Sequence, residues 1–469
     1  MNLYLVVLIV YSLGMIVFGL VLGRGMKGAS DFFVAGRQLG PGLLFSTLLA
    51  SNIGASSTVG ATSLGYDGGI AAWWWVGSAA IGSIALAFWI GPAMRRQAAT
   101  HNLRTVGDYL ECRYNAAVRG VVALLLWVGS IFLLAGQIYG IGSILDTVAD
   151  VPSWVGCAIG GAVITAYFAS GGLHATARVN VLQLAVKLGG FALALPLAMA
   201  AAGGWSAIRE VRAADPVYWS FWRGGPPGLM YLALLTPSFI VSPGLLQKVF
   251  GARDDAAVRL GVGLNALGLF LYAGVPAILG IIARGQFPEL ENSTLALPTV
   301  LVRLLPPAVG AIGLAAVFSA EISAADALLF MLTTSLSQDL YKRFVNPAAG
   351  DQHVVLVARC TTVVVAVVSV LLAISLGSVV TAVTIFYTLL SVSLFVPILT
   401  GLYVPRASST EAMVSIAFGI ATVLAVQFGT ERHVVAGLTP ALAGLLAAAG
   451  SFVVVHLIRM TRHDSAFTI

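Results

Sequence analysis

Two carboxylates and one lysine lie inside apolar segments of this sequence, where charged side chains are rare. Glu321 and Asp326 belong to the stretch FSAEISAADA, and Lys187 belongs to another long apolar run. An unpaired charge at the centre of a bilayer costs about 2.5–3.5 kcal/mol on insertion scales, so such groups face a protein interior or a wet cavity. Glu321 and Lys187 are therefore candidates for handling a charged species.

The composition explains why these charges are unusual. The 469 residues are 59% hydrophobic and only 9% charged, whereas soluble chains carry about 25% charged residues. Apolar runs of roughly 20 residues recur, and each is long enough to cross a bilayer. The sequence therefore predicts an all-α integral membrane protein that is surrounded by lipid.

About thirteen transmembrane helices are expected from these runs. A short interfacial helix is also expected from Thr105 to Arg113. The predicted spans are 3–22, 40–65, 70–94, 117–147, 152–169, 178–202, 228–249, 256–284, 306–338, 354–376, 379–403, 412–428 and 434–458.

The basic residues predict the orientation. With the N-terminus outside and the C-terminus in the cytoplasm, 18 of the 25 Lys and Arg residues, Lys248 among them, fall in inner segments and six in outer ones. This bias is typical of a multi-pass protein of the inner (plasma) membrane. Because the basic residues are spread over many short loops, the net charge of +6 reflects topology, and no nucleic-acid partner is expected.

Two predicted spans contain helix-breaking residues. The stretch LASNIGASSTVGATSLGY (49–66) holds Gly54, and LLTPSFIVSPGLLQKVF (234–250) holds Pro237 and Pro243. Proline removes a backbone donor, and the freed backbone groups must line protein or a wet cavity. Corresponding broken helices in two halves of a chain point to a transporter site between inverted repeats. The alternative is that both are ordinary kinks.

Several motifs resemble the sodium:solute symporter family, over about residues 30 to 345. They are GRQLG (36–40), SNIGASSTVGATSLGYDGG (51–69), the GG-L-x₁₀-Q stretch from Gly171 to Gln183, LLQKVFGARD (245–254) and SAADALLFMLTTSLSQDLYKR (323–343). The resemblance implies a LeuT-type core of two inverted five-helix repeats, with alternating access to a site near the midplane. The whole chain is then one transporter domain, divided into a leading helix and loop (3–39), a first repeat (40–202), an external loop (203–227), a second repeat (228–403) and two trailing helices (404–469).

The resemblance also implies a sodium site and no other cofactor. The implied ligands are the backbone carbonyls of Ala50, Ile53 and Ala320 and the hydroxyl of Ser323. Two positions depart from the family pattern, because Ala324 lacks the usual second hydroxyl and Asn180 stands where an aspartate is common. Both departures remove oxygen or negative charge near the path of the cation.

Lys187 and Glu321 are expected close to that site. Lys187 lies two helical turns beyond Asn180 on the same face, and Glu321 lies about 60° around its helix from Ala324. In some relatives of the wider LeuT fold, a lysine on this helix takes the place of the cation. The two groups are predicted to form a structural ion pair or to titrate during transport. Coupling to sodium, coupling to protons and uncoupled transport therefore all remain open.

The solute site should lie beside the two breaks. Hydroxyls, amides and one aromatic ring suit a small polar organic solute, although small residues also serve close helix packing. The candidate solute-binding residues are Asn52, Ser56, Ser57, Gln137, Thr236, Ser238 and Phe239.

Three other classes of function have less support in the sequence. A membrane enzyme would need clustered catalytic groups at one depth, and the sequence offers none outside the Glu321–Lys187 region, so no enzymatic activity is expected. A channel would need a continuous filter, which paired broken helices do not suggest. A solute sensor on the same fold would bind without net flux.

Overall fold

The chain is helical almost throughout. The computed structural model describes residues 2–23, 37–168, 173–206, 216–222, 227–429 and 438–466. No strand occurs in these ranges, in which Leu39 and Ala252 form an isolated β-bridge. The all-α fold class is confirmed. Most of the predicted external loop 203–227 lies outside the described residues.

The helices run in two series. The first comprises α1 (Leu3–Gly23), α3 (Pro41–Asn52), α4 (Ala61–Gly68), α5 (Trp73–Ala85), α6 (Gly91–Thr100), α7 (Val106–Arg113), α8 (Ala116–Ala149), α9 (Ser153–Phe168) and α10 (Leu173–Ala201). The second comprises α12 (Pro227–Val241), α13 (Pro243–Phe250), α14 (Asp255–Tyr272), α15 (Gly274–Gln286), α16 (Ala296–Thr299), α17 (Pro307–Thr334), α18 (Asp351–Leu376), α19 (Val379–Tyr403), α20 (Ser409–Gly429) and α21 (Pro440–Ala466).

Ten helices in the described ranges are long and apolar enough to cross a membrane. Three shorter apolar helices accompany them, at Leu3–Met15, Ser153–Ala166 and Ser293–Leu304. The predicted number of thirteen spans is therefore not confirmed. One reason is physical: the second predicted span is interrupted, so that its first part, α3, has only 12 residues.

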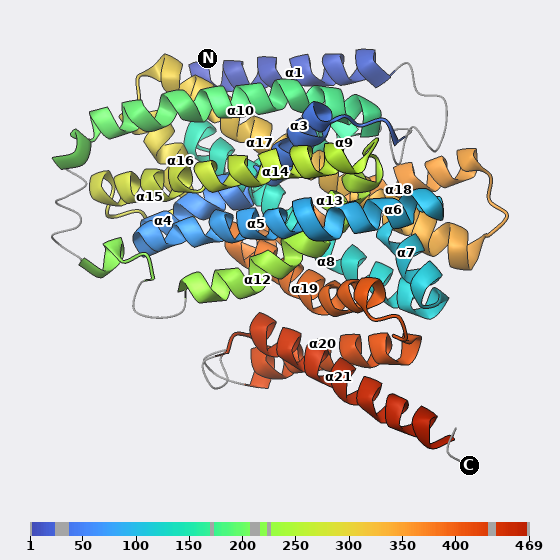
Figure 1. The fold of residues 1–469 in the computed structure, drawn as a ribbon. Helices are drawn as coiled ribbons and strands as arrows, with labels where there is room; N and C mark the ends of the chain where they lie inside the picture. Colours follow the sequence, from blue (N-terminus) through green and yellow to red (C-terminus); the bar gives the residue numbers. More distant parts are fainter. Residues whose placement is uncertain are drawn as a thin grey trace.

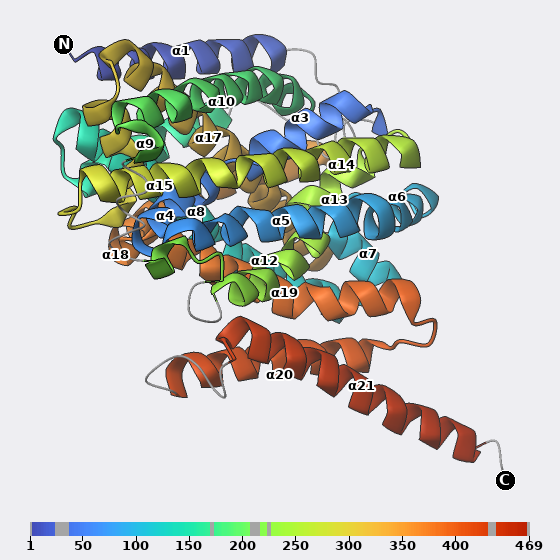
Figure 2. The same cartoon turned by 60° about the vertical axis from the view of Figure 1, so that its left-hand side comes forward.

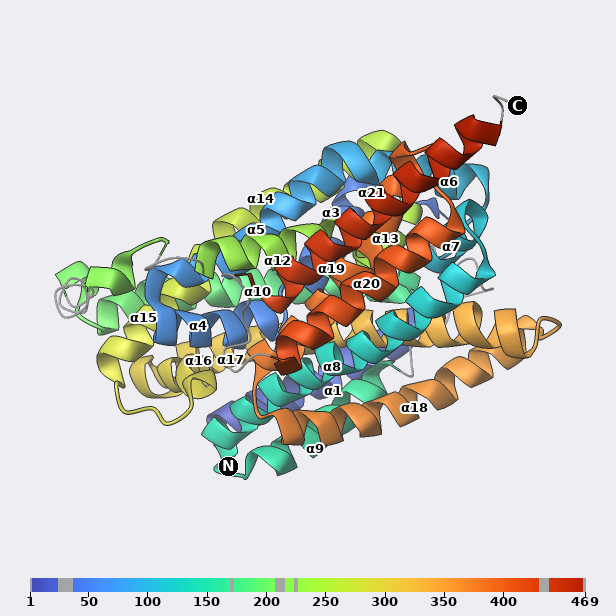
Figure 3. The same cartoon turned by 90° about the horizontal axis from the view of Figure 1, so that it is seen from below.

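The helices lie roughly side by side in one bundle (Figure 1). α1 and α10 lie along one edge, and α20 and α21 lie at the opposite edge, beyond α19 (Figures 1 and 2). The two ends of the chain lie at opposite ends of the bundle (Figure 3). α20 and α21 pack on each other and on α19, whereas α3 packs against α10, α14 and α17.

Both predicted helix breaks are present. α3 ends at Asn52, Ile53 is extended (φ −91°, ψ 94°), and helical backbone resumes with a π-helical turn from Ser56 to Gly60. The second break separates α12 from α13 at Ser242 (φ −54°, ψ 122°). Pro243 opens α13, where its missing N–H costs nothing. The Gly and Pro signals therefore located two real interruptions.

A helix is also present where the interfacial helix was predicted, as α7 (Val106–Arg113). Thr105 caps its first turn, since its hydroxyl accepts from the Asp108 N–H while the Asp108 carboxylate accepts from the Thr105 N–H. This capping box satisfies two donors that the helix start would otherwise leave free.

Candidate functional site

A cavity lies between the two helix breaks. Asn52, Gly54 and Ser56 line it from the first break, and Ser242 and Gly244 line it from the second. Its volume is about 70 Å³, whereas one buried water needs roughly 10–15 Å³. The cavity can therefore hold a small molecule.

Aromatic and apolar side chains complete the wall. Phe239 of α12 packs against Tyr387 of α19, with ring centroids 5.7 Å apart. Phe386 and Met331 also line the cavity, and Gln137 of α8 adds an amide. The lining thus combines hydrogen-bonding groups with flat apolar surface, a combination typical of sites for small organic molecules.

Four of the seven predicted solute-binding residues line this cavity, namely Asn52, Ser56, Gln137 and Phe239. The other three face neighbouring backbone. Ser57 donates to the carbonyl of Asn52 (3.0 Å), Thr236 to that of Ser78 (3.0 Å) and Ser238 to those of Leu234 (2.7 Å) and Tyr387 (3.0 Å). Their hydroxyls serve helix packing, which was the structural alternative.

Gln137 holds the first break in place. Its Oε1 accepts from the N–H of Ala55 at 2.8 Å, a donor that the interrupted helix leaves without a helical partner. Asn52 is fixed similarly, because its amide donates to Oδ1 of Asn265 on α14 at 3.1 Å. The polar wall of the cavity is therefore held by neighbouring helices.

Lys187 reaches the end of α3. It lies at the middle of α10, is fully buried, and donates to the carbonyls of Ala50 and Ile53 (3.1 Å to Ile53) and to the hydroxyl of Ser323. A helix C-terminus carries partial negative charge on its free carbonyls, so it favours a cation. Three of the four oxygens assigned above to sodium therefore contact the Lys187 ammonium. The fourth, the carbonyl of Ala320, accepts from Ser323 at 3.3 Å.

Glu321 lies on α17 beside the same break. Its Oε1 accepts from the Thr58 hydroxyl at 3.0 Å, and it is fully buried. Gly140 of α8 leaves room for it, since a Cβ there would lie 3.1 Å from Oε2. Glu321 interacts electrostatically with Lys187, but no direct ion pair joins these two described residues.

The two departures from the family pattern lie at the end of α3 and at the first break. Asn180 donates to the Thr47 hydroxyl at 3.0 Å, one turn before Ala50. Ala324 lines the cavity and packs on the first break, where a Cβ at Gly54 would lie 2.4 Å from its own Cβ. The second hydroxyl that the family usually has at position 324 is therefore absent at the break itself.

Lys248 is buried inside the bundle, which its predicted place among the inner basic residues did not indicate. It was counted among the inner loop cations, yet it is only 5% exposed, lines the cavity and donates to Ser51 and to the Thr47 carbonyl (3.0 Å). Its position in α13, which begins at Pro243, could have indicated burial. Asp326 interacts electrostatically with it. Tyr387 was missed as well, and nothing distinguishes it from other aromatics of an apolar span.

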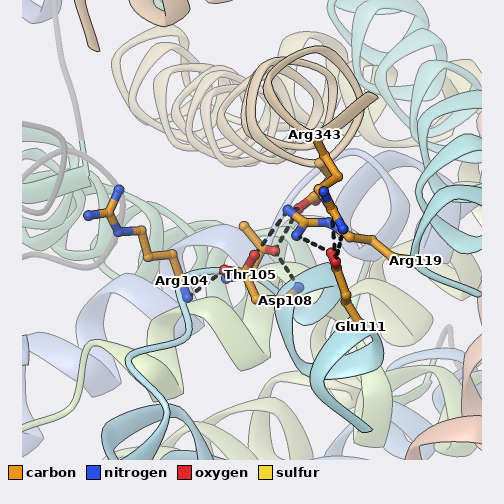
Figure 4. A network of polar contacts seen from close by, with 7 residues as sticks. Arg104, Thr105, Asp108, Glu111, Arg119 and Arg343 are labelled. Carbon is orange, nitrogen blue, oxygen red and sulfur yellow. Dashed lines mark hydrogen bonds and ion pairs between the residues drawn. The ribbon is translucent and has the colours of Figure 1, made fainter. Parts of the chain in front are cut away.

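A separate polar cluster lies where α7, α8 and the segment after α17 meet (Figure 4). Arg119 pairs with Asp108 (3.0 Å), Glu111 (2.9 Å) and Asp339 (2.7 Å). Arg343 pairs with Glu111 at 2.5 Å. Partial burial acts to raise the pKa of Glu111, but the hydrogen bonds from Arg343 and Arg119 outweigh it and hold that pKa below its ordinary value.

A second cavity lies beside this cluster. It is lined by Thr105, Asp339 and Gln247, and also by Met331, which lines the first cavity too. The two cavities are therefore neighbours, with Met331 in the wall of each.

Known proteins share this architecture. A Na⁺-coupled sialic acid symporter, solved in a substrate-bound outward-open state, matches with a TM-score of 0.82 at 18% identity over 97% of both chains. This likeness shows the LeuT-type fold that the sequence implied.

Two curated relatives match over long segments. The sodium/glucose cotransporter of Vibrio parahaemolyticus is 25% identical over 465 residues, covering 87% of this chain and 82% of the relative. The sodium/pantothenate symporter of Escherichia coli K12 is 27% identical over 333 residues, covering 66% of each chain. The model of the sodium:solute symporter family matches residues 32–419. The chain therefore belongs to the sodium:solute symporter family.

Proposed function

We propose that this family member imports a small polar organic solute by alternating access, with the solute bound in the cavity between the two helix breaks. The observation that carries the proposal is that both breaks line one cavity. Members of the family are transporters, not enzymes. Broken helices in a membrane protein supply polar backbone at a depth where lipid offers none.

The lining indicates the class of solute. Asn52, Ser56 and Gln137 can donate and accept hydrogen bonds, while Phe239 and Tyr387 offer ring surface. A solute with several polar groups on a compact carbon skeleton fits this combination. Glucose, pantothenate and sialic acid, which the relatives' names mention, belong to this broad class and support it.

The repeats and the orientation are part of the proposal. Residues 40–202 and 228–403 would form the two inverted repeats, each of which begins with one of the broken helices. The bias of Lys and Arg supports an outer N-terminus and a cytoplasmic C-terminus in the plasma membrane. The polar cluster around Arg119 would then lie on the cytoplasmic side.

Two observations bear on coupling and point in different directions. Family membership supports sodium as the coupling ion. The contacts of Lys187 instead favour a carrier that needs no sodium at the end of α3, since its ammonium bonds the oxygens that the ion would use.

A screen of purified protein tests the proposed function. Thermal unfolding would be measured with amino acids, carboxylates, vitamins and nucleosides, each in sodium chloride and in choline chloride. A compound that raises the unfolding temperature would then be tested for uptake into proteoliposomes. Saturable uptake that is accelerated by the same compound inside the vesicles supports a carrier. Unsaturable flux would indicate a channel, and binding without flux a sensor; either result would contradict the proposal.

The cavity itself is tested with paired variants. Phe239→Ala removes ring surface from the lining and should weaken both binding and uptake. Thr236→Ala, on the same helix, removes a hydroxyl that bonds the Ser78 carbonyl instead of facing the cavity. It should leave solute affinity unchanged. Equal loss of affinity in both variants would place the solute elsewhere.

A further inference from the structure

We propose that the ammonium group of Lys187 occupies the position that the family gives to a sodium ion, so that this transporter neither binds nor requires sodium at the end of α3. The proposal concerns the fit between the chain and the ion and does not depend on the solute. It deepens the proposed function by removing sodium from one position in the coupling scheme.

The contacts carry the first step. A lysine ammonium has three donors and no acceptor, and Lys187 has three acceptors: the carbonyls of Ala50 and Ile53 and the hydroxyl of Ser323. These oxygens come from the helix break and from the facing α17, as the resemblance requires of sodium ligands. An ion and the ammonium cannot both contact them, because both would occupy the same space between α3 and α17.

Burial carries the second step. Lys187 has no exposed surface, so an ion that displaced its ammonium would leave a charged group without these partners inside the bundle. An unpaired charge in such surroundings costs several kcal/mol. The chain's own cation is tethered beside the site, whereas sodium would have to arrive from solution and first move the ammonium away.

The local charges carry the third step. Lys187 interacts electrostatically with Glu321 and Lys248, and Lys248 interacts with Asp326. The formal charges of these two lysines and two acidic residues sum to zero without any added ion. A sodium ion beside them would add a positive charge that no further carboxylate of this group matches, and an unmatched charge in a medium of low dielectric is costly.

The missing hydroxyl carries the fourth step. Ala324 faces the first break with a methyl group, where the family usually supplies an oxygen. The ammonium satisfies its three donors with three of the four oxygens that remain. Sodium would face the same reduced set while also losing its water shell. The oxygens present therefore suit the lysine better than the ion.

Sodium itself is the probe in the test, so no solute is needed. Thermal unfolding of the purified full chain would be followed against sodium chloride concentration, with choline chloride keeping the ionic strength constant, and ²²Na⁺ binding would be measured on the same samples. We expect wild type and Ser323→Ala to show the same response to sodium. A sodium-dependent rise in unfolding temperature in wild type that Ser323→Ala abolishes would overturn the proposal.

The converse test removes the ammonium. Lys187→Ala leaves the two carbonyls and the Ser323 hydroxyl around an open space, so it should gain ²²Na⁺ binding and a sodium-dependent rise in unfolding temperature. Adding Ser323→Ala to this variant should remove both gains. Lys248→Ala, which deletes the other buried ammonium of this region, serves as the matched control and should gain neither. A folded Lys187→Ala without any gain would refute the assignment, and if that variant does not fold, the wild type and Ser323→Ala comparison decides alone.

A result against this inference would not touch the proposed function. Sodium binding at this position in wild type would restore ordinary sodium coupling, and the solute cavity would be unaffected. Failure of every solute screen would instead count against the transport proposal, while the sodium measurements would still be interpretable.

Discussion

Two buried cations in this protein are held in opposite ways. Lys187, at the centre of the bundle, bonds only neutral oxygens, two of which are free carbonyls of an interrupted helix. Arg119, at the end of the bundle, pairs with three carboxylates from α7 and from the segment after α17. Side-chain chemistry matches the setting, because guanidinium is a rigid fork suited to carboxylates, whereas ammonium is a compact point charge that resembles a metal cation.

The two cations therefore have different roles: Arg119 stabilises helix packing, and Lys187, as proposed above, occupies the position of a metal ion. Arg119 ties helices together through groups of opposite charge, so its removal leaves carboxylates without compensation. Lys187 bonds groups that carry no formal charge and that can accept from another cation. The centre should therefore tolerate exchange of its cation better than the end tolerates loss of its own.

The largest effect is expected from Arg119→Met. This change leaves Asp339, whose side chain is only 7% exposed, without its cation. Removal of one partner from a buried ion pair costs about 3–5 kcal/mol. Chemical unfolding of the full chain in detergent measures it. Arg343→Met is the matched control: the Arg343 side chain is 44% exposed and pairs with Glu111, so its loss should cost under about 1 kcal/mol. Equal losses of unfolding free energy in the two variants would contradict the stabilising role of Arg119.

A smaller effect is expected where the first break is crowded. In Gly54→Ala the new Cβ would lie 2.4 Å from the Ala324 Cβ and 2.7 Å from Oε1 of Gln137. Overpacking of this kind costs about 1–3 kcal/mol, and it should also lower solute uptake because Gly54 lines the cavity. Gly42→Ala, in α3 before the break, meets nothing within 4 Å and should retain both stability and uptake. Unchanged uptake in Gly54→Ala would separate the break from the solute path.

The hydrogen bond of Glu321 comes next. Thr58→Val keeps the shape of the side chain but removes the hydroxyl that donates to Glu321. A buried acceptor left without its partner costs about 1–3 kcal/mol, which a thermal melt of the purified protein resolves. Thr58→Ser keeps the hydroxyl and should lose less. If the valine variant proves as stable as wild type, Glu321 depends on Thr58 less than the geometry indicates.

The smallest effect concerns pH at the polar cluster. The pKa of Glu111 is lowered in the folded state, so its ion pairs stabilise the protein above the unfolded-state pKa, and that contribution is lost as pH falls through the folded-state pKa. The stability difference between wild type and Glu111→Gln should be under about 1 kcal/mol. It should shrink as the pH drops below the ordinary value of 4.5. Melts between pH 3 and 7 check it, and a difference that grows on acidification would reverse the sign.

The sequence predicted the breaks better than the faces of the helices. Gly54 and Pro243 constrain the backbone locally, so both interruptions could be located from residue types alone. Lys187 contacts three of the oxygens that the resemblance assigned to a cation, and a two-turn spacing from Asn180 had already placed it on that helical face. The sequence did not predict which way the Thr236 and Ser238 side chains face, since a helix that is apolar all round gives no periodic signal for its rotation.

The burial of Lys248 was also not predicted from the sequence. Lys248 follows a proline and a glycine and lies near the end of an apolar run, so it resembles an ordinary basic residue of an inner loop. Only the path of α13 back into the bundle brings it to the Thr47 carbonyl. The number of spans stays unconfirmed for a related reason: a broken helix is two short pieces, and hydropathy averages over the gap.

Met331 lines both the cavity at the helix breaks and the second cavity, which Asp339 also lines. Its unbranched side chain has three rotatable bonds and adapts readily to its surroundings. A change of rotamer at this one residue would therefore alter the shape of both cavities without displacing any helix. In the proposed transport cycle, this side chain would help to set how large a solute can pass between them.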